Sequence, residues 1–207
     1  MLGVEIDVSR ETKLRLETYV ALVERWNPRI NLIAKSTVQG IWSRHIADSL
    51  QIWPLVEPHV DPDKSQVWLD IGSGGGFPGM VLAILAKEAT PNLKFHLVES
   101  DQRKTAFLRA VSRETGCTAQ IHAERIECVD AINADIISAR ALAPLSVLFD
   151  MSLRHMSLNT VFFFPKGEKW PEEMEQAKKT WSFSAQAHTS KTNANAAILE
   201  IEGLTHV

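Results

Sequence analysis

The stretch Val-Trp-Leu-Asp-Ile-Gly-Ser-Gly-Gly-Gly-Phe-Pro-Gly, residues 67–79, decides the fold of this 207-residue chain. An apolar run ends at an acid, Asp70, and four glycines follow at positions 72 and 74–76 before Pro78 opens a new apolar segment. This pattern predicts a strand, a tight turn and a helix. Glycine costs backbone entropy, so four of them indicate a backbone that bends sharply and comes close to another group, such as a bound ligand. Because a helix start favours an anionic or carboxylate-bearing ligand, a small-molecule cofactor is the first hypothesis.

Two classes of cofactor fit these glycines. The spacing Gly74-x-Gly76-x-x-Gly79 satisfies the dinucleotide fingerprint, and Glu99 lies 20 residues beyond Gly79, where an acid for a ribose hydroxyl is expected. The alternative, Asp70-x-Gly72-x-Gly74-x-Gly76, resembles the first motif of S-adenosylmethionine-dependent methyltransferases. It also accounts for Asp70 and Gly72, which the dinucleotide pattern leaves unexplained. A methyltransferase is therefore favoured over an NAD-dependent oxidoreductase. The other alternative, a non-catalytic cofactor-binding module, would need a broken ligand motif, and none is seen.

Composition limits the partners and the compartment. The chain has 22 Lys and Arg against 25 Asp and Glu, a net charge of −3, so any nucleic acid must meet a local basic patch. Cys117 and Cys128 form no CxxC pair and the seven histidines are scattered, so we expect no metal and no disulfide. The sequence contains neither a leader pattern nor an apolar run of membrane-spanning length, which favours a cytoplasmic protein without a membrane partner.

The residues before the glycine motif are predicted to be helical. Ser9 can cap a helix that runs towards Trp26 and stops at Asn27-Pro28. A second helix is expected to open at the capping box Ser36-x-x-Gln39 and to continue to Trp53. With a linker at 61–65, these patterns predict a helical extension at residues 1–65, followed by a cofactor-binding domain at residues 66–207.

From residue 67 onward, strand and helix patterns alternate, which is typical of a parallel α/β sheet. Strands are expected at 67–71, 94–99, 119–122, 135–139 and 161–164, and helices at 78–87, 102–115, 144–155 and 171–179. Two extended runs at 181–188 and 196–201 should then pair as an antiparallel hairpin. Parallel strands closed by such a hairpin resemble the seven-stranded, Rossmann-like sheet of class I S-adenosylmethionine-dependent methyltransferases.

Ligands of open α/β sheets bind beyond the carboxyl ends of the strands. Glu99, after the second strand, is the natural acceptor for two ribose hydroxyls, and its alternative role as a helix cap can be filled by Asp101. Glu124 and Glu127, after the third strand, compete for an adenine amino group. Phe77 is either an apolar wall for the ligand or packing beneath the helix.

Charged residues elsewhere suggest further roles. Arg140 follows an apolar strand, where an unpaired guanidinium is costly, so it is expected to hold a carboxylate or a phosphate. His45 and Asp48 share one helix face, and a core histidine oriented by the aspartate is favoured over catalysis. A possible basic face for RNA, against the alternative of a solvated helix surface, comprises Lys166, Lys169, Lys178, Lys179 and Lys191.

Longer motifs extend over nearly the whole chain. They are 26–32 (Trp-Asn-Pro-Arg-Ile-Asn-Leu), 44–50 (Arg-His-Ile-Ala-Asp-Ser-Leu), the glycine motif, Arg103-Lys104-x-x-Phe107-Leu108, Arg125-Ile126-Glu127, Ala139-Arg140-Ala141-x-Ala143-Pro144-Leu145 and Lys166-Gly167. Together they resemble the bacterial 16S ribosomal RNA guanine-N7 methyltransferase family, also called glucose-inhibited division protein B. The first two motifs and the Ala-Arg-Ala stretch are specific to this family, whereas the glycine motif is shared by most class I methyltransferases.

This resemblance implies methyl transfer from S-adenosylmethionine to N7 of one guanine in 16S ribosomal RNA of the small subunit. The implied cofactor contacts are Gly72, Phe77, Ile126, Glu127 and Arg140, to which the arguments above add Gly74 and Glu99. The resemblance favours Glu127 over Glu124. No general base is expected, because guanine N7 has a free lone pair. Pro165 departs from the family pattern and leaves the role of Lys166 open.

Overall fold

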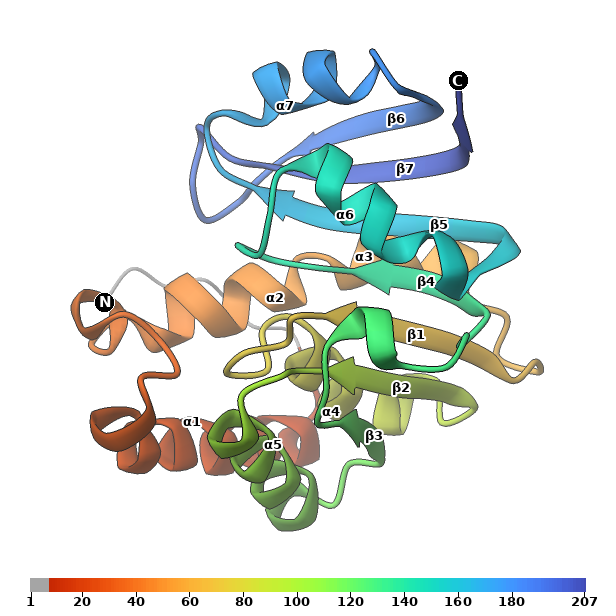
Figure 1. Cartoon of the computed structure of the whole chain (residues 1–207). Coiled ribbons are helices and arrows are strands. Elements are labelled where there is room, and N and C mark those ends of the chain that lie inside the picture. The colour runs from red at the N-terminus through yellow and green to blue at the C-terminus, as the bar shows by residue number, and fades with distance from the viewer. Residues whose placement is uncertain (1–7) are drawn as a thin grey trace.

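The strand that carries Asp70 lies inside a seven-stranded sheet with the order β3-β2-β1-β4-β5-β7-β6 (Figure 1). The computed structural model describes residues 8–207. The parallel strands are β1 (Gln66–Ile71), β2 (Leu93–Val98), β3 (Ala119–His122), β4 (Ala134–Ser138) and β5 (Met156–Lys166). The hairpin β6 (Trp181–Thr189) and β7 (Ala197–His206) adds to β5 in antiparallel orientation. The predicted sheet, including its closing hairpin, is confirmed.

Two strands are longer than their sequence pattern predicts. β5 begins five residues before the expected Val161 and contains Pro165, which pairs in register with Ile198 of β7. Proline lacks an N–H donor, yet it is tolerated here because the pairing of β4 with β5 ends at Phe163, so only β7 borders the strand at this point. β7 continues past Ile201 to His206 because β6 pairs with it up to that residue, with a shift of register between Ser182 and Ser184.

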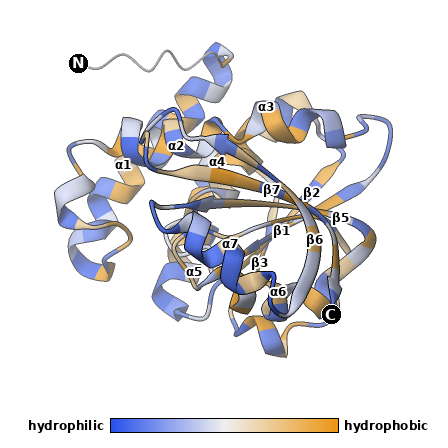
Figure 2. Ribbon diagram, turned by 90° about the horizontal axis from the view of Figure 1, so that it is seen from above, coloured by the Kyte–Doolittle hydropathy of each residue, from blue (hydrophilic) through white to orange (hydrophobic). Residues whose placement is uncertain are grey.

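Four helices of the predicted domain cover the two faces of the sheet, namely α4 (Gly79–Ala89), α5 (Gln102–Thr115), α6 (Leu145–Ser152) and α7 (Trp170–Ala177). Side chains alternate between the faces along each strand. Trp68 packs with α4, α5 and the preceding helices, whereas Leu69 packs with α6 and α7. Figure 2 shows the resulting apolar strands between helices with hydrophilic outer sides. No helix within residues 8–207 is long and apolar enough to cross a membrane.

The first helix, α1, runs from Arg10 to Ile30. Ser9 caps it by accepting a hydrogen bond from the Thr12 amide at 3.0 Å, as predicted. The expected stop at Asn27-Pro28 is wrong, because Pro28 lies in the last turn and interrupts little of the hydrogen-bond ladder. Asn27 fixes the chain beyond the helix, since its Oδ1 accepts from the Ile33 amide at 2.9 Å.

The second predicted helix is broken into short pieces. They are the 3₁₀ turn Lys35–Thr37, a π-helix at Trp42–Ala47, α2 (Asp48–Leu50), α3 (Trp53–Val56) and a 3₁₀ turn at Glu57–His59. The predicted capping box does not form, because Ser36 lies inside the first 3₁₀ turn. A π-helix widens the turn by one residue and is frequent at functional sites. His45 lies in this π-helix, so its contacts are of interest for function.

The helices before β1 are not a separate unit in packing. Tyr19 and Val23 of α1 and Ile46 of the π-helix belong to the same buried cluster as Phe107 of α5 and Trp68 of β1. A loop at 60–65 precedes β1, where the sequence places the linker. Because the two parts share one buried cluster, we expect them to unfold as one unit. The division at residue 65 stays a prediction.

Candidate active site

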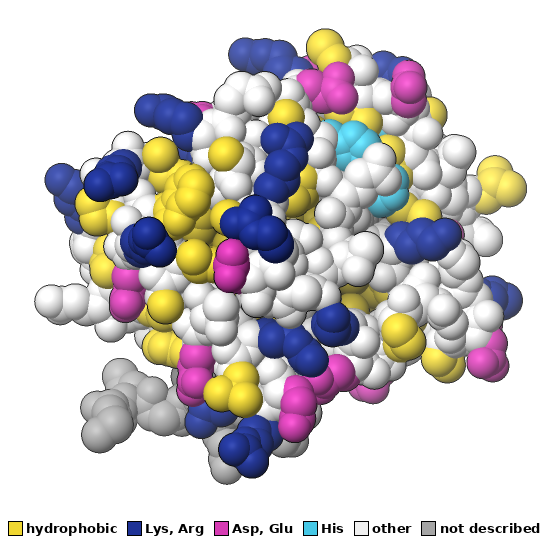
Figure 3. Space-filling model, turned by 90° about the horizontal axis from the view of Figure 1, so that it is seen from below, with side chains coloured by type: hydrophobic (Ala, Val, Ile, Leu, Met, Phe, Trp, Pro, Cys, Tyr) yellow, Lys and Arg dark blue, Asp and Glu magenta, His cyan; other side chains and the backbone are white. Residues whose placement is uncertain are grey.

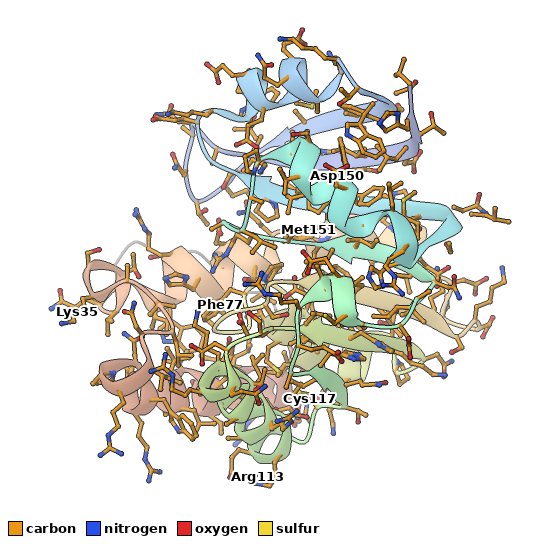
Figure 4. All side chains as sticks on the ribbon, in the orientation of Figure 1. Lys35, Phe77, Arg113, Cys117, Asp150 and Met151 are labelled. Atoms are coloured by element: carbon orange, nitrogen blue, oxygen red, sulfur yellow. The ribbon has the colours of Figure 1, made fainter. Side chains whose placement is uncertain are left out.

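A cavity of about 470 Å³ lies at the carboxyl ends of the strands, around the glycine turn. All seven residues predicted to bind the cofactor line it: Gly72, Gly74, Phe77, Glu99, Ile126, Glu127 and Arg140. They come from four separate loops, which follow β1, β2, β3 and β4. Figure 4 shows Phe77 beside the helical extension and Met151, a further lining residue, on α6. The parallel sheet thus brings together residues that are up to 68 positions apart, from Gly72 to Arg140.

The glycine turn requires glycine at specific positions. Gly72 has a φ of 67°, in the left-handed region, and a Cβ there would approach the side chain of Leu142 to 2.8 Å. Gly76 has a φ of 95°, and its Cβ would approach the Tyr19 hydroxyl to 2.6 Å. That hydroxyl donates a hydrogen bond to the carbonyl of Gly75, so α1 holds the turn directly. The turn is therefore shaped from both sides, by the helical extension and by the loop after β4.

Glu99 holds the turn from the end of β2. Its side chain is almost buried, with 9% of the residue exposed. Oε2 accepts from the Gly74 amide at 2.9 Å and Oε1 accepts from the Asp101 amide at 2.8 Å. Asp101 caps α5 through the amides of Arg103 and Lys104, so the alternative role for Glu99 as a helix cap is excluded. Each Glu99 oxygen keeps a lone pair for a ligand.

Phe77 combines the two roles that the sequence left open. It is buried, and its ring stacks on Tyr19 at a centroid distance of 5.3 Å and lies 4.9 Å from the ring of His45. The guanidinium carbon of Arg140 is 5.2 Å from the Phe77 centroid, within the range of a cation–π contact. The ring thus packs beneath the turn and also borders the cavity.

Arg140 is paired within the chain. Its Nη1 donates to Asp48 Oδ2 at 2.9 Å, and its Nη2 lies 3.0 Å from Nδ1 of His45. The expectation that Asp48 orients His45 is wrong, because both side chains bind Arg140 instead. The π-helix explains this geometry, since it presents His45 to the loop after β4 while Asp48 follows at its end.

His45 is neutral in this arrangement. Burial, and then the charge of Arg140, lower the pKa of His45 from 6.5 to about 4. Since Nδ1 faces a guanidinium that donates, the ring proton lies on Nε2, which is 2.8 Å from Thr37 Oγ1. The ion pair of Arg140 with Asp48 leaves little net positive charge at this position of the cavity.

Asp70 supports the turn from below and is absent from the cavity lining. Its Oδ1 accepts from the Ser138 hydroxyl at 2.6 Å, whereas its buried Oδ2 has no hydrogen-bond partner among the described residues. Burial raises the pKa of Asp70 from 3.8 to about 6. A Cβ on Gly79 would approach the Asp70 carboxylate to 2.6 Å, so α4 can begin here only with glycine. Asp70 is therefore a packing residue of the motif.

The loop after β3 offers two acids to the cavity. Glu124 and Glu127 both line it, together with the buried Ile126 between them. The choice of Glu127 over Glu124 stays a prediction, because both carboxylates remain within reach of the cavity. Met151 of α6 extends the apolar surface beside Ile126.

The predicted basic face does not form. Lys166 is buried, where its Nζ lies 2.6 Å from Glu173 Oε2 and donates to the Ala143 carbonyl at 2.8 Å. Lys166 therefore connects β5 to α7 and to the loop after β4. These contacts give Lys166 a structural role, which the sequence had left open. Lys178 and Lys191 lie at opposite ends of the nine-residue strand β6. At ~3.3 Å per residue, they are separated by roughly 30 Å.

Several cavity residues were not predicted from the sequence. Leu32 and Ile33 of the helical extension, Lys104 of α5 and Leu142 of the loop after β4 all line it. They are ordinary apolar or surface residue types, and their local pattern carries no signal of a ligand. The packing of the helical extension over the carboxyl ends of the strands places Leu32 and Ile33 there, whereas Lys104 and Leu142 reach the cavity from segments that follow β2 and β4.

The sheet order, the closing hairpin and a glycine turn held by an acid after β2 define the chain as a class I S-adenosylmethionine-dependent methyltransferase. Solved structures share this fold. A methyltransferase of this cofactor class from Aquifex aeolicus is 11% identical with a TM-score of 0.55, covering 79% of this chain and 92% of that one. P. horikoshii TYW2 in complex with MeSAdo is 12% identical with a TM-score of 0.57, covering 78% of this chain and 62% of that one.

Closer relatives identify the family. The family model of GidB, the rRNA small subunit methyltransferase G, matches residues 12–201. Ribosomal RNA small subunit methyltransferase G of Ruegeria pomeroyi is 47% identical over 202 residues, 98% of this chain and 96% of the relative. The protein of that name from Paracoccus denitrificans is 48% identical over 97% of this chain and its own full length, 100%. The chain belongs to the rRNA small subunit methyltransferase G family, which confirms the resemblance seen in the sequence.

Proposed function

We propose that this enzyme transfers a methyl group from S-adenosylmethionine to N7 of a guanine in 16S ribosomal RNA of the small subunit, in the cytoplasm. One observation carries the proposal beyond family membership. The cofactor cavity adjoins a second cleft of about 550 Å³, and Arg140, Ala141 and Leu142 line both. A cofactor in the cavity and an RNA base in the second cleft would come into contact at this loop.

The residues of the cavity fit S-adenosylmethionine in chemistry. The nearly buried Glu99 carboxylate offers acceptors for the ribose hydroxyls, and Glu127 offers one for the adenine amino group. Ile126 and Met151 supply an apolar surface for a flat base. The turn at Gly72 allows the backbone to approach a ligand closely. When bound, the cofactor supplies a methyl group activated by its positively charged sulfur.

Arg140 is compatible with such a ligand because Asp48 neutralises it at 2.9 Å. An unpaired guanidinium would repel a sulfonium, whereas this ion pair has little net charge. In our proposal, Arg140 is a positioning residue. It fixes the loop that separates the cavity from the second cleft, and it does so through the π-helix of the helical extension.

The transfer needs no general base. Guanine N7 is an acceptor with a free lone pair, so it would take up the methyl group without a proton having to leave. His45, the histidine of the cavity lining, stays neutral at physiological pH because its pKa is about 4. The task of the protein is then to hold the reacting atoms in line, an effect that supplies on the order of 7–11 kcal/mol.

The RNA-binding surface is proposed on α1 and α5 instead of the scattered lysines. A groove of about 510 Å³ between these helices is lined by Arg25 and Arg29 of α1 and by Arg113 of α5, around the partly buried Trp26. Figure 3 shows Lys and Arg side chains gathered around an apolar patch over this part of the molecule, and Figure 4 shows Arg113 at its lower end. Arg25 and Arg29 can bind backbone phosphates, whereas Arg113 pairs with Glu114, which lines the same groove, at 3.2 Å.

A titration tests the cofactor assignment. The purified chain should bind S-adenosylmethionine and S-adenosylhomocysteine but not NAD, and it should methylate guanine N7 in small ribosomal subunits. Tight NAD binding without a response to S-adenosylhomocysteine would overturn the cofactor assignment. Methylation of another atom, or of no RNA, would overturn the substrate assignment alone.

Charge reversal tests the RNA-binding surface. The double change Arg25→Glu and Arg29→Glu should weaken RNA binding and reduce its salt dependence, by a slope of about one for each lost phosphate contact. The matched control is Lys178→Glu with Lys179→Glu, on the distant end of α7. Both variants should keep the wild-type affinity for S-adenosylhomocysteine. Equal loss of RNA affinity in the two variants would show that only net charge matters.

A further inference from the structure

Three metal-ligand residue types meet on the sheet away from the cofactor cavity. His59 ends the last turn before β1, and Glu200 and Glu202 lie two residues apart on β7, so their side chains share one face of the strand. His59 Nε2 lies 2.9 Å from Glu200 Oε1, and its Nδ1 lies 3.7 Å from Glu202 Oε1. One ligand atom of each residue falls within 4.8 Å of the others, an arrangement found only once among residues 8–207. None of the three lines the cofactor cavity.

We propose that His59, Glu200 and Glu202 bind a divalent transition metal ion, with Zn²⁺ as the best fit. The mixed set of one imidazole and two carboxylates suits Zn²⁺, whereas Mg²⁺ and Ca²⁺ prefer oxygen ligands alone. With bonds of ~2.0 Å, neighbouring tetrahedral ligands lie roughly 3.3 Å apart. His59 offers one ring nitrogen to an ion, and its Nε2 lies 2.9 Å from Glu200 Oε1, close to this separation. One ligand atom from each of the three residues lies within 4.8 Å of the others, so a small side-chain rotation brings all three to an ion.

His188 of β6 supports the cluster from outside. Its Nε2 lies 2.6 Å from Oε2 of Glu200, the oxygen that does not face His59. A metal-binding carboxylate is usually oriented by such a hydrogen bond, and this second contact leaves Oε1 directed at the site. The ring of His59 is held as well, because it lies edge-on at 5.7 Å from Phe163. The side chains of Glu200 and His59 are therefore held in place before an ion binds.

The exposure of the cluster allows an ion to enter. Glu202 has 53% of its side chain exposed, whereas the His59 and Glu200 side chains are exposed by 24% and 17%. The site thus has a fixed inner side and an accessible outer ligand, with room for water at the remaining position. It would connect the helical extension, through His59, to the closing hairpin. Sequence spacing could not predict it, because His59 and Glu200 are 141 residues apart.

Calorimetric titration of the chelator-treated full chain with ZnCl₂ tests this proposal. We expect one equivalent to bind, with Mg²⁺ and Ca²⁺ giving no response at the same concentrations. Glu202→Gln and His59→Ala should each weaken binding at least tenfold, and His188→Gln by 10–100-fold as an outer partner. Glu202 is exposed, so its substitution tests the site even where His59→Ala fails to fold.

The matched control is His206→Gln, which removes an exposed histidine from the same strand and should leave Zn²⁺ affinity unchanged. Co²⁺ should give the visible absorption of a bound ion in the wild type and lose it in Glu202→Gln. Absence of Zn²⁺ binding, or equal binding by the wild type and Glu202→Gln, would show that the cluster is an ordinary set of hydrogen bonds.

Discussion

Removing the Glu99 carboxylate is the sharpest test of the candidate active site, because this side chain has both a structural and a proposed ligand role. Glu99→Ala eliminates two hydrogen bonds, from the amides of Gly74 at 2.9 Å and Asp101 at 2.8 Å. A hydrogen bond to a charged group contributes about 1.5–3 kcal/mol, and a buried donor left unpaired costs about 1–3 kcal/mol. Because water can enter from the cavity, we expect the free energy of unfolding to fall by about 2–4 kcal/mol.

The same change should weaken cofactor binding. Loss of the contact to the ribose hydroxyls is expected to cost about 1.5–3 kcal/mol, which raises the dissociation constant of S-adenosylhomocysteine roughly 10- to 150-fold. The measurements are calorimetric titration and urea denaturation of the same preparations. Glu99→Gln should lower the cofactor affinity and the free energy of unfolding by less than Glu99→Ala, because one oxygen acceptor remains.

The control for Glu99 is Asp101→Ala. Asp101 caps α5 without lining the cavity, so its removal should lower the stability through loss of the helix cap and leave the affinity unchanged. An unchanged dissociation constant in Glu99→Ala, together with lowered stability, would refute the ligand role and leave Glu99 as a brace of the glycine turn. Equal losses of affinity in Glu99→Ala and Asp101→Ala would show that only stability is being measured.

Three further outcomes are expected. The folded pKa of Asp70, about 6 against 3.8, means that its contribution to stability is full below pH 3.8 and is lost as the pH rises through 6. Urea denaturation should therefore show Asp70→Asn gaining about 3 kcal/mol on the wild type between pH 3 and 7, and a constant difference would contradict the buried carboxylate. Gly72→Ala should lower the free energy of unfolding by about 1–2 kcal/mol in the same assay, because its φ of 67° is strained for a residue with a Cβ, and unchanged stability would contradict that geometry. The single-turnover methylation rate on small subunits should be nearly flat from roughly pH 6.5 to 8.5, where a general base would titrate, and a tenfold rise per pH unit would refute direct attack by N7.

Local patterns of the sequence determined the architecture. Apolar runs followed by turn residues located all seven strands, and the short segment between the last two identified the antiparallel hairpin. Asp101 was recognised as the cap of α5 because capping acts over three residues. Carboxyl ends of parallel strands share one edge of a sheet, and this rule brought the glycine turn, Glu99 and Arg140 together in the prediction. The choice of Ile126 and Glu127 came from the family resemblance.

Only the tertiary structure decided which side chains pair. Arg140 meets Asp48 across 92 residues, Lys166 is buried against Glu173, and the helix expected at 36–53 is broken so that His45 reaches Arg140. Lys178 and Lys191, which the sequence groups in one basic face, are separated by the length of β6. The physical reason is that an isolated charge is costly to bury, so a partner must be found, but nothing in the local pattern specifies where along the chain that partner lies.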